Sequence, residues 1–374
     1  MDLSYSEEQL MLQDSIQKWV ADNYDLSRRK DIVQMEHGFD PANWAQFAEL
    51  GWLAMPFDEE FGGFGGDAVD IMLILEEFGK GLVVEPYLAT VVMFGGAVAM
   101  AGNASQKAAL IPAIIDGSLI GTYAYAEPQA HHNDFDIATT ATKDGDFYRI
   151  NGQKSVVLNA AAADKMIVTT RTAGDQTDES GISLFIVDRE TAGVTVEAYP
   201  TVDGLHAAEV TFKDVQVAAE NLLGEAGQGG SLVTSIANKA ILALAAEAVG
   251  GMEVLYKSTI DYTRQREQFD HPLSEFQVLK HRMTEMFMEH SLAKSVTMKA
   301  TMLETQGAAD TQRTIHALKY LIGKSGRFVG QNAVQLHGGM GMTEELAIAH
   351  YFKRLMVIDS QFGNTDHHLT RFVA

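Results

Sequence analysis

The residues with the most conspicuous chemistry lie near the end of the chain. The stretch DSQFGNTDHHLTRF, residues 359–372, contains the adjacent histidines His367 and His368 and the carboxylate of Asp366. Such side chains act as metal ligands or as general acids and bases. Adjacent side chains on a helix point about 100° apart, and the stretch offers no third ligand at a suitable spacing. We therefore expect no metal, and expect the histidine pair to cap a helix or to hydrogen-bond at an interface.

A glycine-rich phrase upstream offers a second kind of chemistry. Gly338, Gly339 and Gly341 follow a helical pattern and do not open a helix after a strand, so they do not form the usual dinucleotide fingerprint. A glycine pair after a helix exposes backbone N–H groups and lets a pyrophosphate approach closely, and an arginine such as Arg266 supplies a charge-assisted donor. The competing interpretations are a helix C-cap turn for the glycines and a surface ion pair between Arg266 and Glu267.

The composition narrows the range of functions. The 374 residues include 28 basic and 50 acidic side chains, and the formal charge of −22 disfavours nucleic acids and anionic membranes as partners. The absence of cysteine excludes disulfides, thiolate catalysis and cysteine-based metal centres. The first residues, MDLSYSEEQLML, do not resemble a signal peptide. The apolar stretches 87–102 and 240–251 are shorter than the ~20 residues of a membrane span, so we expect buried helices in a cytoplasmic protein.

The elements that must position these residues follow from the hydrophobic period, which changes twice. Residues 1–120 carry apolar side chains at three- and four-residue spacing, which predicts helices. Residues 121–223 alternate and are rich in β-branched side chains, which predicts strands. Residues 224–374 return to helical patterns. The sequence thus predicts an α+β multidomain protein with an N-terminal helical domain, a middle antiparallel β-barrel domain and a C-terminal helical domain.

Turn and cap residues mark the ends of several elements. Ser6 is placed to cap the first helix. The pairs Asp144-Gly145 and Asn151-Gly152 are typical of tight turns between antiparallel strands. We therefore expect two hairpins in this part of the middle domain.

Five phrases, in order, resemble signatures of the acyl-CoA dehydrogenase family, and the resemblance extends over essentially the whole chain. They are ELGWLAMPFDEEFGGFGG at 49–66, the segment 125–160 that begins YAEPQAHHNDFD, AAEVTFKDVQVAAENLLGEAGQG at 207–229, RQREQFDHPLSEFQ at 264–277 and QLHGGMGMTEE at 335–345. The resemblance implies a flavoenzyme of lipid catabolism with bound FAD, a C-terminal four-helix bundle and a tetrameric assembly. It also implies an acyl-CoA thioester as substrate, desaturated between its α and β carbons, and electron-transfer flavoprotein as electron acceptor.

The resemblance assigns cofactor roles to particular positions. In the family, the counterparts of six positions hold the ADP half of FAD across a subunit interface. The resemblance also implies that the flavin half contacts the backbone around Tyr123 and Ala126 and the hydroxyl of Thr365. The positions for the ADP half are Arg266, Phe269, Gln277, Gln335, Gly338 and Gly339. Without the resemblance, Phe269 would be read as a core residue and Gln277 as an amide on a helix surface.

This sequence departs from the family at the flavin half. Ala126 and Leu158 stand where relatives have threonines, so two hydroxyl donors to the flavin are missing. Main-chain donors can still bind the ring because they do not depend on the side chain. Asp270 stands where a glycine is usual, and we expect its carboxylate to point away from the pyrophosphate or to meet a partner such as His271.

The reaction also requires a carboxylate that removes a proton beside the thioester carbonyl. The family's usual glutamate falls on Gly363, and a second known position falls on Ala240, so neither is acidic here. Two other carboxylates are candidate catalytic bases. Glu247 lies on the same helix face as Ala240, about 10 Å further along the axis, and Asp366 follows Gly363 by three residues. The competing interpretation of Glu247 is a buried polar residue satisfied by a neighbouring element.

Two hypotheses therefore remain open from the sequence. The first is a self-sufficient FAD-dependent acyl-CoA dehydrogenase that uses Glu247 or Asp366. The second is a non-catalytic partner subunit, resembling the smaller chain of bacterial heterotetrameric acyl-CoA dehydrogenases that act on bulky, steroid or dicarboxylic thioesters. Such a chain would supply Arg266, Phe269 and residues 335–339 to a partner that brings the base. Loss of a general base typically costs ~10²–10⁴-fold in rate, so such a chain would be a poor enzyme alone.

Overall fold

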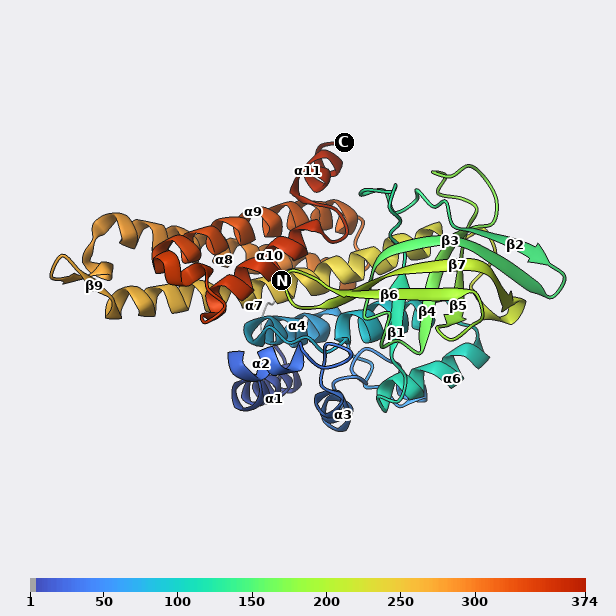
Figure 1. Ribbon diagram of the computed structural model, residues 1–374, viewed down its shortest axis with the longest axis horizontal. Coiled ribbons are helices and arrows are strands. Elements are labelled where there is room, and N and C mark those ends of the chain that lie inside the picture. Colours follow the sequence, from blue (N-terminus) through green and yellow to red (C-terminus); the bar gives the residue numbers. More distant parts are fainter. Residues whose placement is uncertain (1–4) are drawn as a thin grey trace. The chain divides into compact units, whose positions relative to one another are not determined.

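The computed structural model describes residues 5–374 (Figure 1). Helices precede and follow a block of strands along the chain, which confirms the predicted order of helical, β and helical parts. The chain packs into two compact units, each joining segments that are distant in sequence. The helical unit combines the chain up to Asp31 with residues 68–83 and 241–374, and the β unit combines residues 32–67 and 84–240.

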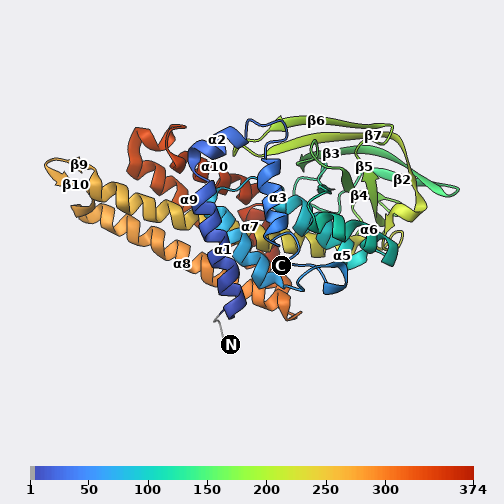
Figure 2. The same ribbon diagram turned by 90° about the horizontal axis from the view of Figure 1, so that it is seen from below.

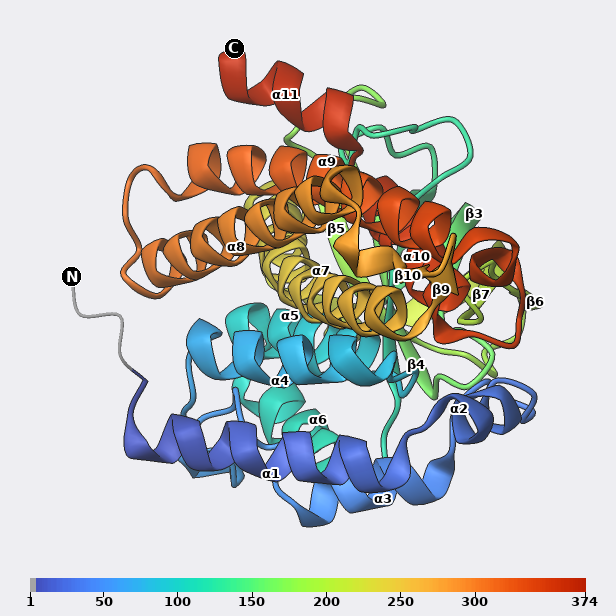
Figure 3. The ribbon, with the colours of Figure 1, turned by 90° about the vertical axis from the view of Figure 1, so that its left-hand side faces the viewer.

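Long helices dominate the helical unit, and Figure 3 shows α8 and α9 running side by side. The helices are α1 (Glu7–Asn23), α2 (Leu26–Ile32), α4 (Ala68–Gly81), the larger part of α7 (Gly230–Gln265), α8 (Gln277–Thr305), α9 (Thr311–His337), α10 (Ala347–Ser360) and α11 (Thr365–Val373). The short elements are β9 (Glu267–Gln268), β10 (His271–Pro272), η4 (Leu273–Glu275) and η5 (Gly338–Met342). Helix α9 packs against α8, α10 and α11. A regular four-helix bundle stays a prediction.

Local signals explain where the first helix begins. The Ser6 hydroxyl accepts a hydrogen bond from the backbone N–H of Gln9 at 3.1 Å, and the Gln9 side chain accepts one from the backbone N–H of Ser6 at 3.2 Å. This reciprocal capping box satisfies two backbone donors that a helix start otherwise leaves free. The predicted cap is confirmed.

Glycines allow α4 and α7 to cross at very close range. A Cβ atom on Gly79 would lie 2.0 Å from the carbonyl oxygen of Glu247, and a Cβ atom on Gly250 would lie 2.0 Å from that of Glu76. No other residue type fits at either position, because real Cβ atoms do not approach a carbonyl so closely. The crossing fixes the backbone of α7 at Glu247, one of the predicted catalytic residues.

Helix α7 is long and strongly apolar. By length and composition alone it could cross a membrane, but 72% of its most apolar window is buried within the structure, as in a core helix of a folded protein. Residues 240–246 are each at most 8% exposed. The predicted buried helix in this part of the chain is confirmed.

The β unit contains one mixed sheet. Its strands are β1 (Gly121–Ala124), β2 (Thr140–Asp144), β3 (Phe147–Leu158), β4 (Lys165–Arg171), β5 (Ile182–Asp188), β6 (Val194–Pro200), β7 (His206–Ala218) and β8 (Leu222–Leu223). Its helices are α3 (Pro41–Glu49), η1 (Glu59–Phe61), η2 (Leu88–Gly95), α5 (Gly96–Ala101), α6 (Ala104–Ile115) and η3 (Ala219–Asn221). Figure 2 shows the strands fanned beside α5 and α6.

The sheet is open, so the predicted closed antiparallel barrel is wrong. The strand order is β6, β7, β3, β2, β4, β5, β8, with β1 paired to β4, and in the described part of the chain β6 and β8 form two separate edges. Strands β1 and β2 each run parallel to β4, whereas the other pairs are antiparallel. Alternating hydrophobicity predicts strands, but it carries no information on strand direction or on whether two edges meet.

Only one of the two predicted tight turns exists. Asp144 pairs with Phe147 across the turn between β2 and β3, and Gly145 has φ +62°, as predicted. Asn151 and Gly152 instead lie inside β3, at a shift of register against β7. A Cβ atom on Gly152 would lie 2.6 Å from Thr139 Cα, so this glycine serves a bulge and a close approach of two backbones.

One core histidine predicts a pH dependence of stability. Both ring nitrogens of His290, on α8, are buried without a hydrogen-bond partner among residues 5–374. Burial is the main cause that lowers its pKa to about 4; Lys294 lowers it further, and Glu253 opposes the shift. Because the unfolded state then binds more protons between about pH 4 and 6.5, stability falls as the pH falls through this window.

We therefore expect His290→Phe to raise the free energy of unfolding at pH 7 by about 1 kcal/mol or more, because it removes an unsatisfied buried group. The variant should also lose less stability than the wild type between pH 6.5 and 4.5. Urea denaturation at both pH values measures the two effects. His281→Gln, at an exposed position of the same helix, is the control, and an equal pH slope in wild type and His290→Phe would contradict the prediction.

Candidate functional site

The ends of α7 and α9 meet in the helical unit, and we call this part of the unit the α7–α9 end. The rings of Tyr262, near the end of α7, and His337, at the end of α9, stack with centroids 4.3 Å apart. The Arg266 carbonyl accepts a hydrogen bond from the backbone N–H of Leu273 at 2.8 Å, which closes the loop between α7 and α8. Arg266 therefore directly follows one of the two stacked helix ends and Gly338 directly follows the other.

The α7–α9 end is open to a ligand. Phe269 is 84% exposed, and an apolar ring gains no free energy from contact with water. Its backbone has φ +57°, which is rare for a residue with a side chain and common at ligand sites. Positions where Cβ atoms of Gly338 and Gly339 would stand have no heavy atom within 4 Å. Gln335, like Arg266, is exposed.

Two further residues complete this surface. Gln277 is the first residue of α8 and is exposed. Asp270 is exposed with φ +64°, and His271 forms its contact with Glu275 at 2.9 Å instead of with Asp270. The predicted partner of Asp270 is therefore engaged elsewhere. The other expectation, that the Asp270 carboxylate points away from the pyrophosphate, stays a prediction.

The predicted flavin half lies on β1 and the segment after it, in the β unit. A buried lysine orders this segment: the ammonium of Lys154 donates to the Tyr125 carbonyl at 3.2 Å, to the Glu127 carboxylate at 2.7 Å and to the Thr169 hydroxyl at 2.8 Å. All three of its protons are thus used. The carbonyl of Ala126 accepts the backbone N–H of Ser155 at 2.8 Å. The backbone from Tyr125 to Glu127 is therefore held in one conformation.

The electrostatics of this pair follow from its burial. Burial lowers the pKa of Lys154 to about 8, although the charge of Glu127 opposes the shift. For Glu127, burial acts to raise the pKa, but attraction and hydrogen bonding from Lys154 outweigh it and lower the pKa. The Glu127 carboxylate also accepts the backbone N–H groups of Ala138 and Thr139. Glu127 therefore stays ionised and joins β3 to the segment before β2.

Glu247 has a partner that the sequence does not reveal. Arg354, on α10, donates to one oxygen of its carboxylate at 2.5 Å and to the other at 2.7 Å, and both side chains are buried. A bidentate ion pair of this kind holds the carboxylate in a fixed position. This geometry gives Glu247 a structural role; its role as a catalytic base stays a prediction.

Position 363 disfavours a side chain. Gly363 has φ +95°, and a Cβ atom there would lie 2.7 Å both from Cδ2 of His367 and from Nε2 of His368. His368 is buried, faces the Phe362 carbonyl through Nε2 at 2.8 Å and faces His316 Nδ1 through its own Nδ1 at 3.0 Å. The histidine pair thus occupies the space into which a residue-363 side chain would project.

A stripe along α9 holds the loop around Gly363. The buried ammonium of Lys319 donates to the carbonyls of Asp359 at 2.9 Å and Gly363 at 2.7 Å. One turn further, a Cβ atom on Gly323 would collide with the Asp359 carboxylate, so this glycine leaves room for it. Another turn along, Arg327 donates to the same carboxylate at 3.1 Å. Burial lowers the pKa of Lys319 to about 8, against the charge of Asp359.

Thr365 and Asp366 lie just after this loop. The hydroxyl and the backbone N–H of Thr365 both donate to Oδ1 of Asp359, at 2.7 and 3.0 Å. The donor of this hydroxyl is therefore committed, and toward a ligand it can only accept a hydrogen bond. Asp366 lies in the first turn of α11 and is exposed, whereas Asn364 supplies the cap of that helix.

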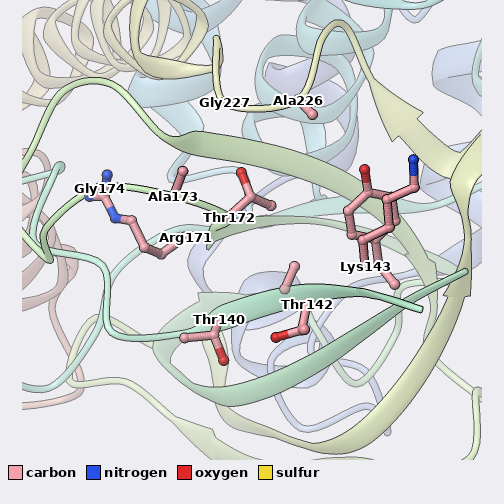
Figure 4. A pocket seen from close by; sticks show the side chains of 11 residues that line it. Thr140, Thr142, Lys143, Arg171, Thr172, Ala173, Gly174, Ala226 and Gly227 are labelled. Carbon is pink, nitrogen blue, oxygen red and sulfur yellow. The ribbon is translucent and has the colours of Figure 1, made fainter. Parts of the chain in front are cut away.

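Two further observations concern a possible metal site and a hollow on the β unit. Among residues 5–374, no three histidine, aspartate or glutamate side chains gather so as to hold a metal ion. A hollow of about 520 Å³ on the β unit is lined by Thr140, Thr142, Lys143, Arg171 and Thr172, among others (Figure 4). None of the predicted site residues lines it.

Sequence reasoning missed the residues that hold the site in place: Lys154, Lys319, Arg354 and Asp359. A signal existed for Lys319, which interrupts an apolar face in the segment IHALKYLIG, because a charged residue at a core position must have a partner. The identity of that partner, two backbone carbonyls some forty residues away, is not readable from a local pattern.

Family models match almost the whole chain. The models of the acyl-CoA dehydrogenase N-terminal, middle and C-terminal domains match residues 6–118, 122–215 and 227–373. The chain belongs to the acyl-CoA dehydrogenase family. Acyl-CoA dehydrogenases are flavoproteins that contain FAD and oxidise a CH–CH bond, and they act in fatty acid metabolism.

Individual relatives extend this similarity to full-length folds. A short-chain-specific acyl-CoA dehydrogenase of Megasphaera elsdenii is 29% identical over 86% of this chain and 86% of its own. The crystal structure of an acyl-CoA dehydrogenase from Geobacillus kaustophilus has a TM-score of 0.92 at 30% identity and covers 99% of this chain and 98% of its own. A steroid acyl-CoA dehydrogenase variant has a TM-score of 0.89 at 27% identity, covering 98% and 97%.

The residues of this acyl-CoA dehydrogenase fit the ADP half of FAD on one observation. The α7–α9 end exposes an arginine, an aromatic ring and a glycine pair whose Cβ positions are empty, which suits an ADP group.

The closed position 363 makes a testable prediction. We expect Gly363→Ala to lower the free energy of unfolding by about 2 kcal/mol or more, because φ +95° disfavours a side chain and the two histidine rings occupy its space. Gly363→Glu should be destabilised further and should gain no dehydrogenation activity. Urea denaturation and dye-linked turnover measure these effects.

Gly62→Ala is the matched control, because Gly62 has φ +91° but no heavy atom within 4 Å of its Cβ position. It isolates the backbone strain from the collision with the rings. Equal losses of stability in the two alanine variants would show that the histidine pair does not close the position.

Proposed function

We propose that this chain catalyses the α,β-desaturation of an acyl-CoA thioester with a bulky acyl group, such as a steroid side chain or a dicarboxylic acid. The observation that carries the proposal is the α7–α9 end, where Arg266, Phe269 and the pair Gly338-Gly339 form an exposed cradle for a dinucleotide. The similarity to a steroid acyl-CoA dehydrogenase supports the choice of acyl group. Electron-transfer flavoprotein is the proposed acceptor, and a cytoplasmic location stays a prediction.

The chain's own residues would divide the chemistry between them. When bound, FAD supplies the hydride acceptor. Arg266 would neutralise the pyrophosphate charge, and the N–H groups of the glycine pair would donate hydrogen bonds to the pyrophosphate at close range. A carboxylate would remove the α proton, and Asp366 is the better placed of the two predicted bases, because it is exposed while Arg354 holds both oxygens of Glu247.

A second function is favoured by one specific observation. The histidine rings fill the space beside Gly363 and Arg354 pairs with Glu247, which favours a site whose base comes from another subunit. In this alternative the chain is a partner subunit of a heterotetramer and contributes the α7–α9 end to the FAD of its neighbour. The first proposal instead needs a homotetramer in which each chain contributes both parts.

The cradle is tested by one arginine and its neighbour. We expect Arg266→Met to weaken FAD binding at least tenfold, because a charge-assisted contact to the pyrophosphate is lost. Arg264→Met is the control, because Arg264 is also exposed, on the last turn of α7, and forms an ion pair with Asp261. Fluorescence titration of the apoprotein with FAD measures both. Equal affinities in the two variants would remove the ADP role from Arg266.

The base is tested by a pair of isosteric substitutions. If Asp366 is the base, Asp366→Asn should lower kcat by ~10²–10⁴-fold with unchanged stability and FAD content. Glu247→Gln should instead lower the free energy of unfolding by about 3 kcal/mol, because it breaks the buried bidentate ion pair with Arg354. Turnover with steroid-type and dicarboxylic acyl-CoAs and urea denaturation measure the two effects.

The same experiment separates the two functions. A yellow homomer that turns over acyl-CoA and loses this activity in Asp366→Asn or Glu247→Gln supports the self-sufficient enzyme. A chain that is inactive alone, and becomes active when a related subunit is co-expressed, rules that enzyme out and supports the partner subunit.

A further inference from the structure

The hollow on the β unit lies where two strands of the sheet separate. Strands β2 and β4 run parallel and share one pair of opposed residues, Thr140 and Arg171, at the end of β4. Beyond this pair the chain leaves β4 for the loop 172–181, so in the described chain residues 141–143 have no strand beside them on that edge of β2. The hollow of about 520 Å³ lies in this fork, and Gly227 also lines it (Figure 4).

Two polar side chains reach the hollow from the core face of the sheet. Lys143 and Tyr148 are direct partners across β2 and β3, so their side chains lie on the same face. The preceding pair on that face, Ala141 and Ile150, belongs to the buried core. Lys143 and Tyr148 therefore lie where the core ends and the hollow begins, and both line the hollow.

Both side chains have uncommitted donors within residues 5–374. Tyr148 is only 7% exposed and its hydroxyl has no hydrogen-bond partner, yet the oxygen is not enclosed by the protein and so opens into the hollow. Lys143 is exposed and forms no ion pair, and the neighbouring Asp144 is paired with Arg149 at 2.8 Å. Since tyrosine hydroxyls on buried side chains normally have a partner, the accessible side of this one suits a ligand.

The charge of the hollow is opposite in sign to that of the whole chain. None of the residues that line it, as far as the structure describes the chain, is acidic, although the formal charge is −22. Figure 4 shows Lys143 at one end of the hollow and Arg171 at the other. The guanidinium of Arg171 donates to four backbone carbonyls and its Nε is enclosed, so it supplies positive charge but no accessible donor. Two cations without a lining carboxylate favour an anion.

The size and lining of the hollow narrow the class of anion. A hollow of this volume holds a small organic molecule and is larger than a single ion requires. Apart from Lys143, Tyr148 and Arg171, the lining residues in the described chain are threonines, alanines and glycines. An acyl chain would therefore find no large aliphatic side chain to contact, whereas a polar body such as a sugar meets hydroxyls and backbone groups.

We propose that the hollow in the fork between β2 and β4 binds a small phosphate ester with a polar body, and that Lys143 and Tyr148 donate hydrogen bonds to its phosphate group. A phosphate group presents three acceptor oxygens and about two negative charges, which suit an ammonium and a hydroxyl together. The site lies within the β unit and contains none of the predicted cofactor or catalytic residues. The proposal therefore goes beyond the proposed function and does not depend on it.

Three related sugars test the class of ligand: glucose 6-phosphate, glucuronate and glucose. In isothermal titration calorimetry of the full chain at fixed ionic strength, glucose 6-phosphate should bind with a Kd of about 1 mM or below, and glucuronate about tenfold more weakly. Glucose should not bind. Equal affinities for glucose 6-phosphate and glucuronate would overturn the assignment to phosphate, and failure of both glucose 6-phosphate and inorganic phosphate to bind in the millimolar range would overturn the site.

Two substitutions test the donors. Lys143→Met should weaken the binding of glucose 6-phosphate about tenfold, because the ammonium is lost, and Tyr148→Phe about three- to fivefold, because only a hydroxyl is lost. Lys213→Met is the matched control and should leave the Kd unchanged. Lys213 is also an exposed lysine on a strand of the β unit, forms no ion pair within residues 5–374 and does not line the hollow.

The remaining outcomes also decide the proposal. A lysine directed inward at a strand edge can instead hinder pairing with another sheet; in that case Lys143→Met and Tyr148→Phe would bind glucose 6-phosphate as Lys213→Met does, and the proposal would be overturned. Displacement of glucose 6-phosphate by an acyl-CoA would show that the hollow belongs to the substrate site, which would overturn a separate site. Because the titrations need neither FAD nor turnover, failure of the proposed function would leave their result unchanged.

Discussion

The loops of both units depend on one kind of interaction, a buried cation that donates to backbone carbonyls. Lys154 binds the Tyr125 carbonyl in the β unit, and Lys319 binds those of Asp359 and Gly363 in the helical unit. A charge without water around it must be surrounded by acceptors, and a loop carbonyl is such an acceptor only in one backbone conformation. The need to satisfy the cation therefore fixes the shape of the loop.

Arg171 shows the same principle without a carboxylate. Its guanidinium donates to the carbonyls of Phe135, Gln176, Asp178 and Ser180, and so joins two loops of the β unit. Arginine suits this task because its planar group presents five donors in fixed directions. The rigid elements of the chain are thus linked to irregular segments by side chains, where no ladder of backbone hydrogen bonds is available. This arrangement lets the loops near a site be ordered before any ligand binds.

This constraint also bears on the position where the family resemblance predicts a base. With Lys319 holding its carbonyl and the histidine rings filling the space beside it, Gly363 is disfavoured as a place for a carboxylate side chain. The histidine pair fills the space beside this position. The carboxylate at Asp359 is not free either, because Thr365 and Arg327 use its oxygens.

The sequence by itself determined the order of helices and strands and the family, because periodicity and short motifs are local properties of the chain. Only the tertiary structure decided that Glu247 is paired with Arg354, 107 residues away, that the sheet stays open, and that the hydroxyl of Tyr123 has no partner within residues 5–374. These facts depend on which groups the packed chain brings together, and a buried polar group is satisfied or left unsatisfied by neighbours that lie far from it in sequence.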